Sequence, residues 1–203
     1  MHTPEFRRHF FGSVHVQTFM ALRVATKGWN AAADALIDEG VASGAMIVHG
    51  GKGTSWAQEK RRKLVTRVIF LQNITNVGER ACKLAINLVV VDIPEGVESI
   101  GDYAFLACCS LTTVSFPATL TLIGTSTFNE CISLENVDLL HTNLQELGSD
   151  AFADCKNLTS MTILDSLQKL GQLVFCRCSK LAPSNINVNK TKAVISHLRS
   201  QQQ

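Results

Sequence analysis

One sequence pattern occurs five times in succession through the middle of this chain of 203 residues, at a nearly constant period. Each copy opens with an aliphatic residue, and successive copies begin 23, 23, 23 and 24 residues apart. Self-similarity at such a period predicts a solenoid, in which each coil buries its apolar side chains only against its neighbours. The copies are residues 65–87, 88–110, 111–133, 134–157 and 158–180.

The positions that the copies share predict the path of each coil. Aliphatic or aromatic side chains stand at positions 1, 4, 6, 10 and 13, with glycine at 14, phenylalanine at 18 and cysteine at 21. The alternation around positions 4 and 6 has the period of a strand with one inward face, and stacked strands would form a parallel ladder at about 4.8 Å per coil. The third copy shows the whole pattern in Leu111, Val114, Phe116, Leu120, Ile123, Gly124, Phe128 and Cys131.

The second half of each copy predicts a corner followed by compact packing. The glycine at position 14 suits a tight corner that needs either a positive φ or a close approach of two backbones. After it, segments such as 101–105 and 148–152 favour a short helical turn, and the phenylalanines are expected to form a buried stack. The extra residue of the fourth copy falls within 140–143 and predicts a local protrusion. The corner glycines are Gly78, Gly101, Gly124, Gly148 and Gly171, and the phenylalanines of the expected stack are Phe105, Phe128, Phe152 and Phe175.

Residues 88–108 read Leu-Val-Val-Val-Asp-Ile-Pro-Glu-Gly-Val-Glu-Ser-Ile-Gly-Asp-Tyr-Ala-Phe-Leu-Ala-Cys. This pattern resembles the Treponema-type, or BspA-like, leucine-rich repeat, and the resemblance covers residues 65–187. The first copy departs from it, with Cys82 where phenylalanine is expected and Ala85 where cysteine is expected. The resemblance implies a curved, β-rich solenoid that binds proteins or cell surfaces and has no enzymatic activity.

The flanking segments complete the expected architecture. Apolar residues recur at three- and four-residue steps from Leu22 to Leu36, and Gly40 ends this helical pattern. Leu181 starts a sixth coil that is not completed, and a helix is expected after it. We therefore predict an α/β repeat solenoid of five leucine-rich-type coils with a parallel strand ladder. Its parts are a helical N-terminal segment at 1–40, a linker at 41–64, the solenoid at 65–187 and a C-terminal capping helix at 188–203.

Residues 1–40 allow two interpretations. They could simply cap the open first coil, which a solenoid needs for solubility. Alternatively, their apolar spacing, which ends in the helix-like run Leu22-Arg23-Val24 and Trp29, resembles an F-box, with Thr3 in place of the expected leucine. That resemblance implies docking on a Skp-type linker of a ubiquitin ligase, with the repeats holding the substrate. The residues that would contribute are Pro4, Phe10, Phe11, Phe19, Leu22 and Trp29.

Four of the seven cysteines, Cys108, Cys131, Cys155 and Cys178, occupy position 21 and should form a ladder. We interpret them as buried thiols that act as small hydrophobes. A zinc site would need four converging ligands, whereas a ladder spreads its sulfur atoms along an axis. Disulfides between adjacent coils are possible by distance, but the odd count and the lack of a secretory leader favour the reduced state.

The charge distribution bears on the class of partner. Residues 1–64 carry nine Lys and Arg against five Asp and Glu, residues 65–187 carry seven against twelve, and residues 188–203 carry three against none. An acidic solenoid is not expected to bind nucleic acid, because phosphate binding demands clustered basic residues. No stretch approaches the ~20 apolar residues of a membrane span. The N-terminus lacks the plan of a signal peptide, so an intracellular, cytoplasmic protein with a protein partner of unknown identity is expected.

The candidate binding surface follows from the strand pattern. If positions 4 and 6 face inward, positions 3 and 5 of each copy face outward, and position 2 adds Val89 and Glu135 at the rim. This mixed polar strip suits a modest protein contact, or it is only a solvated sheet face. Its residues are Arg67, Ile69, Val90, Asp92, Thr113, Ser115, Asn136, Asp138, Ser160 and Thr162.

Enzymatic activity and cofactors are not expected. The six histidines are scattered, and none has metal or catalytic spacing to a cysteine or carboxylate motif. Residues 47–55 contain the run His49-Gly50-Gly51, but they match neither a phosphate-binding loop nor, without a Gly-x-Ser-x-Gly element elsewhere, an esterase oxyanion loop. We predict no catalytic, cofactor-binding or metal-binding residue.

Overall fold

The computed structural model describes residues 45–48, 65–70, 74–163 and 166–188, and the structural statements below concern these residues. The chain divides into two units, Met1–Gly40 and Val41–Gln203, and every described residue belongs to the second. The predicted helical segment at 1–40 therefore lies outside the described residues. So does the predicted capping helix at 188–203, apart from the residue that ends the last strand.

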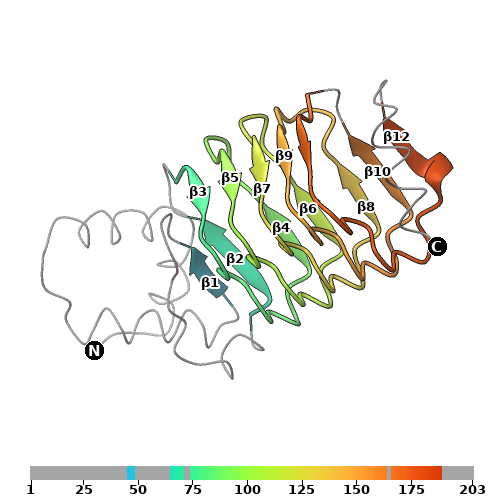
Figure 1. The fold of residues 1–203 in the computed structure, drawn as a ribbon. Coiled ribbons are helices and arrows are strands. Elements are labelled where there is room, and N and C mark those ends of the chain that lie inside the picture. The colour runs from blue at the N-terminus through green and yellow to red at the C-terminus, as the bar shows by residue number, and fades with distance from the viewer. Residues whose placement is uncertain (1–44, 49–64, 71–73, 164–165, 189–203) are drawn as a thin grey trace, which may run out of the picture. The chain divides into compact units, whose positions relative to one another are not determined.

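One strand of every coil lies along the same side of the solenoid, which we call the first ladder (Figure 1). Its parallel strands form three separate hydrogen-bonded sheets, β1–β2, β4–β6 and β8–β10–β12. Residue pairs such as Val91 and Val114 lie opposite one another, so the stacking follows the sequence period. β1 lies within the segment predicted as a linker and pairs with β2, and β12 belongs to the incomplete sixth coil. The strands are β1 (Ala45–Val48), β2 (Arg67–Phe70), β4 (Val90–Asp92), β6 (Thr113–Ser115), β8 (Asn136–Asp138), β10 (Ser160–Ile163) and β12 (Ile186–Val188).

A second ladder, which the sequence analysis did not predict as strands, forms another side of the solenoid (Figure 1). It is one five-stranded parallel sheet in which position 13 of each copy points inward, as Val77 and Ile100 do. Two residues are enough for each of the inner strands because they are hydrogen-bonded to a strand on both sides, and each edge strand, β3 and β11, pairs with one neighbour. The strands are β3 (Asn76–Val77), β5 (Ser99–Ile100), β7 (Leu122–Ile123), β9 (Glu146–Leu147) and β11 (Lys169–Leu170).

The third side of each coil is built from turns, so the predicted helical turns, and with them the α/β class, are wrong for the described residues. The backbone N–H groups of Tyr103, Phe105 and Ala107 donate to carbonyls of the next coil at 2.8–2.9 Å, and the three equivalent bonds recur at each coil interface. Tyr103 and Ala107 have positive φ angles of 58° and 57°. A single helical turn is costly to nucleate, and bonding between coils satisfies the same donors. The only helix among the described residues is the 3-10 turn Pro183–Asn185, and the fold is a parallel β-solenoid.

The corner glycines are required by close approach of backbones and not by a positive φ. Among the described glycines, only Gly96, outside the corners, has a positive φ. A Cβ atom placed on Gly124 would lie 2.8 Å from the backbone N of Asp102, and one on Gly148 would lie 2.5 Å from the backbone N of Thr125. Any other residue at this corner would therefore push the coils apart.

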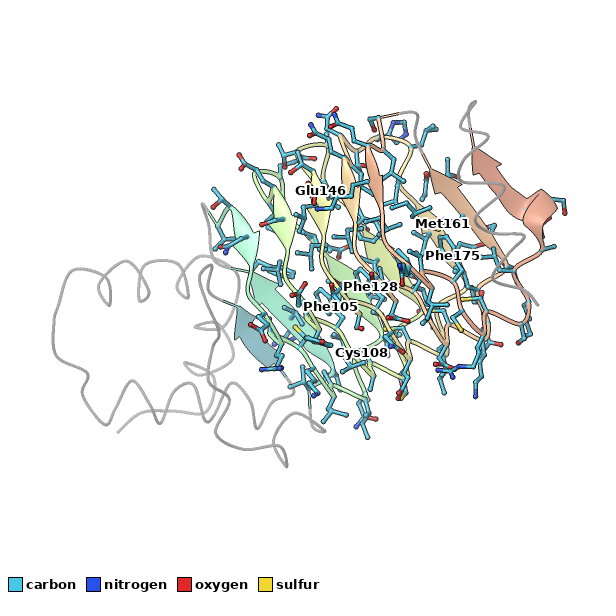
Figure 2. All side chains as sticks on the ribbon, in the orientation of Figure 1. Phe105, Cys108, Phe128, Glu146, Met161 and Phe175 are labelled. Carbon is cyan, nitrogen blue, oxygen red and sulfur yellow. The ribbon has the colours of Figure 1, made fainter. Side chains whose placement is uncertain are left out.

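The predicted phenylalanine stack is confirmed and forms the centre of the core (Figure 2). The ring centroids of Phe105 and Phe128 lie 5.2 Å apart, those of Phe128 and Phe152 also 5.2 Å, and those of Phe152 and Phe175 6.1 Å. The rings are stacked, and the aliphatic residues that open each copy are buried beside them. Burying a side chain of this size stabilises the fold by about 1.5–3 kcal/mol.

The extra residue of the fourth coil produces the predicted protrusion. Leu140 and His141 are exposed, while Thr142 is buried and donates its hydroxyl to the Leu139 carbonyl at 2.8 Å. The side chain of Asn143 donates to the carbonyl of Ala118 in the preceding coil at 3.0 Å. The protrusion is therefore anchored at its base.

Candidate interaction surface

The first ladder presents repeat positions 3 and 5 to solvent, as the strand pattern predicted. In β4, β6 and β8 the central valine is buried and its two neighbours are exposed. Arg67 is also exposed, Ser160 and Thr162 are half-buried, and the side chain of Ile69 lies outside the described set. We call the predicted residues on this face, together with position 2 of each copy, the outward strip.

Hydrogen bonds between coils hold several side chains of the outward strip in place. The hydroxyl of Ser115 donates to Oδ1 of Asp92 at 2.8 Å, and that of Ser160 donates to Oδ1 of Asn136. At position 2, the Thr112 hydroxyl donates to the backbone carbonyl one coil back at 3.1 Å, as does its equivalent in the fifth copy. These side chains are thus ordered before any partner arrives.

The outward strip combines acidic groups with exposed aliphatic ones. Asp92, Glu135 and Asp138 are exposed carboxylates, and the described cation on the strip is Arg67. Val89 and Val90 are 44% and 46% exposed, which is unusual for aliphatic residues on a strand. The strip therefore has one acidic centre and one apolar end.

Leu140 extends the outward strip in a way that sequence reasoning missed. It is 43% exposed and follows Asn136 and Asp138 at two-residue steps just beyond β8. Its backbone N–H donates to Oδ1 of Asp138 at 2.9 Å, which fixes both residues. Continued alternation past the strand, together with the extra residue of this coil, was the available signal.

The cysteine ladder consists of buried thiols, in agreement with the interpretation that these cysteines act as small hydrophobes. None of the seven cysteines forms a disulfide, and those at position 21 are buried. The thiols of Cys131 and Cys155 donate to the carbonyls of Phe105 and Phe128 at 3.3 and 3.2 Å. Burial raises the pKa of Cys131, and the hydrogen bond with Cys178 together with burial raises that of Cys155. The thiols of Cys131 and Cys155 are therefore protonated at neutral pH and are poor nucleophiles, whereas the hydrogen bond with Cys155 lowers the pKa of the Cys178 thiol.

The described part of the chain offers neither a cluster of metal-ligating side chains nor a membrane-spanning helix. There, no three His, Cys, Asp or Glu side chains lie close enough together to hold a metal ion. Nor does this part contain a helix with the length and apolar character needed to cross a membrane. His49 and the glycine run after it lie outside the described residues.

Comparison with known families fits this geometry. The family described as "BspA type Leucine rich repeat region" matches residues 61–192 in six copies. The chain belongs to the BspA-type leucine-rich repeat family. The match begins and ends close to the solenoid predicted from the sequence.

Solved structures of bacterial leucine-rich repeat proteins share the fold of this BspA-type chain. One from Bacteroides ovatus is 26% identical, with a TM-score of 0.52, over 56% of this chain and 29% of its own. One from Eubacterium ventriosum is 19% identical (TM-score 0.59; 73% and 40% of the two chains), and one from T. pallidum is 23% identical (TM-score 0.57; 79% and 84%). This chain thus spans less than a third of the length of the Bacteroides ovatus protein. No curated protein matches.

The BspA-type assignment does not extend to residues 1–40, which lie outside both the family match and the described residues. The F-box-like interpretation of Pro4, Phe10, Phe11, Phe19, Leu22 and Trp29 therefore stays a prediction. The leucine-rich repeat fold by itself indicates a protein-interaction module.

Proposed function

We propose that this BspA-type protein is a non-catalytic, intracellular interaction module that binds a protein partner through the outward strip. The observation that carries the proposal is a row of outward-facing side chains on the first ladder, several of which are already ordered by hydrogen bonds between coils. The entropic cost of binding is smaller when the side chains at the interface are already held in place. No cofactor is needed for such a role.

The acidic charge of the strip supports a protein partner, and the cysteines support an intracellular setting. Carboxylates at Asp92, Glu135 and Asp138 repel phosphate groups, so neither a nucleic acid nor an anionic membrane surface suits the strip. Free cysteines are usual in reducing compartments, whereas secreted proteins tend to pair them. The seven cysteines, none of which forms a disulfide, therefore favour an intracellular setting.

Site-specific photo-crosslinking tests the function. A photoreactive amino acid is placed at Thr113 on the first ladder or, as a matched control, at the exposed Gln145 just before β9 of the second ladder. The expected result is one defined adduct from Thr113 that untagged wild-type protein competes away, with no such adduct from Gln145. Equal adducts from both positions, or none from Thr113, would contradict the proposal.

A further inference from the structure

The dimensions of the outward strip limit the kind of partner that fits. The strip covers five coils at ~4.8 Å per coil, so it is about 20 Å long, and the width of positions 2–5 is about 10 Å. Its area, on the order of 200 Å², is well below the ~800 Å² per partner that two folded proteins usually bury. A single polypeptide segment lying along the stack matches this area better than the face of a globular domain.

The charges on the strip select a basic segment. Asp92, Glu135 and Asp138 face solvent, and none of them has a described cationic partner. The second ladder differs, because its Glu146 carboxylate already pairs with Lys169 at 3.0 Å. Charge complementarity therefore favours Lys or Arg opposite the first ladder.

The spacing of two carboxylates indicates the conformation of that segment. Asp92 and Asp138 occupy the same repeat position two coils apart, which places them about 10 Å apart along the stack. In a polyproline II helix, residues i and i+3 lie on one face about 9.3 Å apart. In a β-strand, same-face residues are about 6.6 or 13 Å apart, and neither distance matches.

The aliphatic side chains of the strip complete the match. Val89 and Val90 lie in the coil of Asp92, and Leu140 lies beside Asp138, so each carboxylate has an exposed apolar neighbour. The methylene stems of Lys and Arg pack on such groups while their charged ends reach the carboxylates. A polyproline II backbone has no internal hydrogen bonds, so its free carbonyls can accept from Thr113, in the coil between the two sites, and from Asn136, in the coil of Asp138.

We propose that the outward strip binds a basic polypeptide segment in the polyproline II conformation, with Lys or Arg at every third residue, aligned along the stack. This rests on the proposed function and names the chemistry of the partner. Asp92 and Asp138 accept the two basic side chains, and the exposed valines and Leu140 contact their stems.

Fluorescence polarisation with synthetic peptides tests the proposal on the full chain. The probe is a labelled peptide of the repeat Lys-Pro-Thr, and the comparison peptide has the same length and composition in a scrambled order, in which no two Lys residues lie three residues apart. The paired variant D92N/D138N removes the two carboxylates. The control E98Q/E130Q changes the net charge equally on the second ladder and on the turn side, where both carboxylates are exposed.

The expected result is saturable binding of the Lys-Pro-Thr probe that weakens with added salt, as an exposed ionic contact should. D92N/D138N should weaken it by roughly fivefold or more, whereas E98Q/E130Q should leave it within about twofold. Circular dichroism melting of both variants checks that they remain folded.

Three outcomes would overturn the proposal. Equal losses in the two variants would mean non-specific charge attraction, and equal affinity for the two peptides would refute the three-residue spacing. Failure of every basic peptide to bind would refute the basic partner. In that last case, a competed adduct from Thr113 would still support the proposed function, so the two failures are distinguishable.

Discussion

The thiol of Cys131 donates a hydrogen bond to the backbone carbonyl of Phe105 in the preceding coil, at 3.3 Å. The same carbonyl accepts the N–H of Cys108 at 3.2 Å, so the Phe105 oxygen joins two coils. Position 21 thus needs a side chain that is small and apolar and that can still donate. This explains why the repeat uses cysteine where alanine would fill much of the space.

Replacing Cys131 by alanine should lower the free energy of unfolding by about 1–2 kcal/mol, through the lost donor and the small cavity left behind. Urea unfolding followed by circular dichroism measures the change. Cys109→Ala is the control, because Cys109 is half-buried and lies outside position 21. It should change the stability by less than about 0.5 kcal/mol, and an equal effect at both positions would refute the proposed role of the ladder.

The stability should fall as the pH rises above about 8.5, the usual pKa of an unfolded thiol. Burial raises the pKa of Cys131 in the folded state, so between the two pKa values the unfolded chain has lost a proton that the folded chain retains. The slope for this thiol is at most about −1.4 kcal/mol per pH unit. Urea midpoints at pH 7, 8.5 and 9.5 should show a steeper loss in the wild type than in Cys131→Ala, and parallel curves would contradict the expectation.

Gly148→Ala should be among the most damaging single changes to the solenoid. The added methyl group would lie 2.5 Å from the backbone N of Thr125, and backbone cannot move aside without separating two coils. We expect a loss of about 2–3 kcal/mol in thermal or urea unfolding.

Gly96→Ala tests the effect of an unfavourable backbone φ without the steric clash that Gly148→Ala introduces. Gly96 has a φ of +95°, but the nearest atom to an added Cβ is 3.9 Å away. Gly96→Ala should lower the free energy of unfolding by about 1 kcal/mol, from backbone strain alone. A larger loss at Gly96 than at Gly148 would mean that close approach is not the reason for the corner glycines.

The hypothesis for residues 1–40 predicts recovery of a Skp-type linker from a eukaryotic lysate by the full chain and not by a chain lacking these residues. Mass spectrometry of the two pull-downs measures the difference. A full chain carrying Leu22→Ala and Trp29→Ala controls for misfolding of the deletion and should also lose the linker. No recovery by the full chain, with aggregation of the deletion, would indicate that residues 1–40 only cap the solenoid.

Much of the solenoid could be predicted because each inward position recurs with the same period. Val91, Val114 and Val137 are buried as the alternation required, and the protrusion at Leu140 follows from one extra residue in one copy. The outward strip was predicted by the same alternation. Its missing member, Leu140, continues the two-residue alternation beyond the end of β8, but the strand pattern was applied only to positions 3 and 5.

The second ladder and the turns could not be predicted from local preference. A two-residue strand such as Ser99–Ile100 has too few residues to show a period, and it exists only because equivalent strands lie on either side of it. Tyr103 and Ala107 adopt positive φ angles that their side chains disfavour. Hydrogen bonds to the next coil offset that cost.

The amino-acid sequence by itself determined the period, the buried phenylalanine stack and the outward face of the first ladder, because all of these depend on which side chains recur. Only the tertiary structure decided the reason for the corner glycines, the turn conformation after them and the donor role of the cysteines. These features depend on distances between coils, and a chain has no such distances until neighbouring coils are stacked.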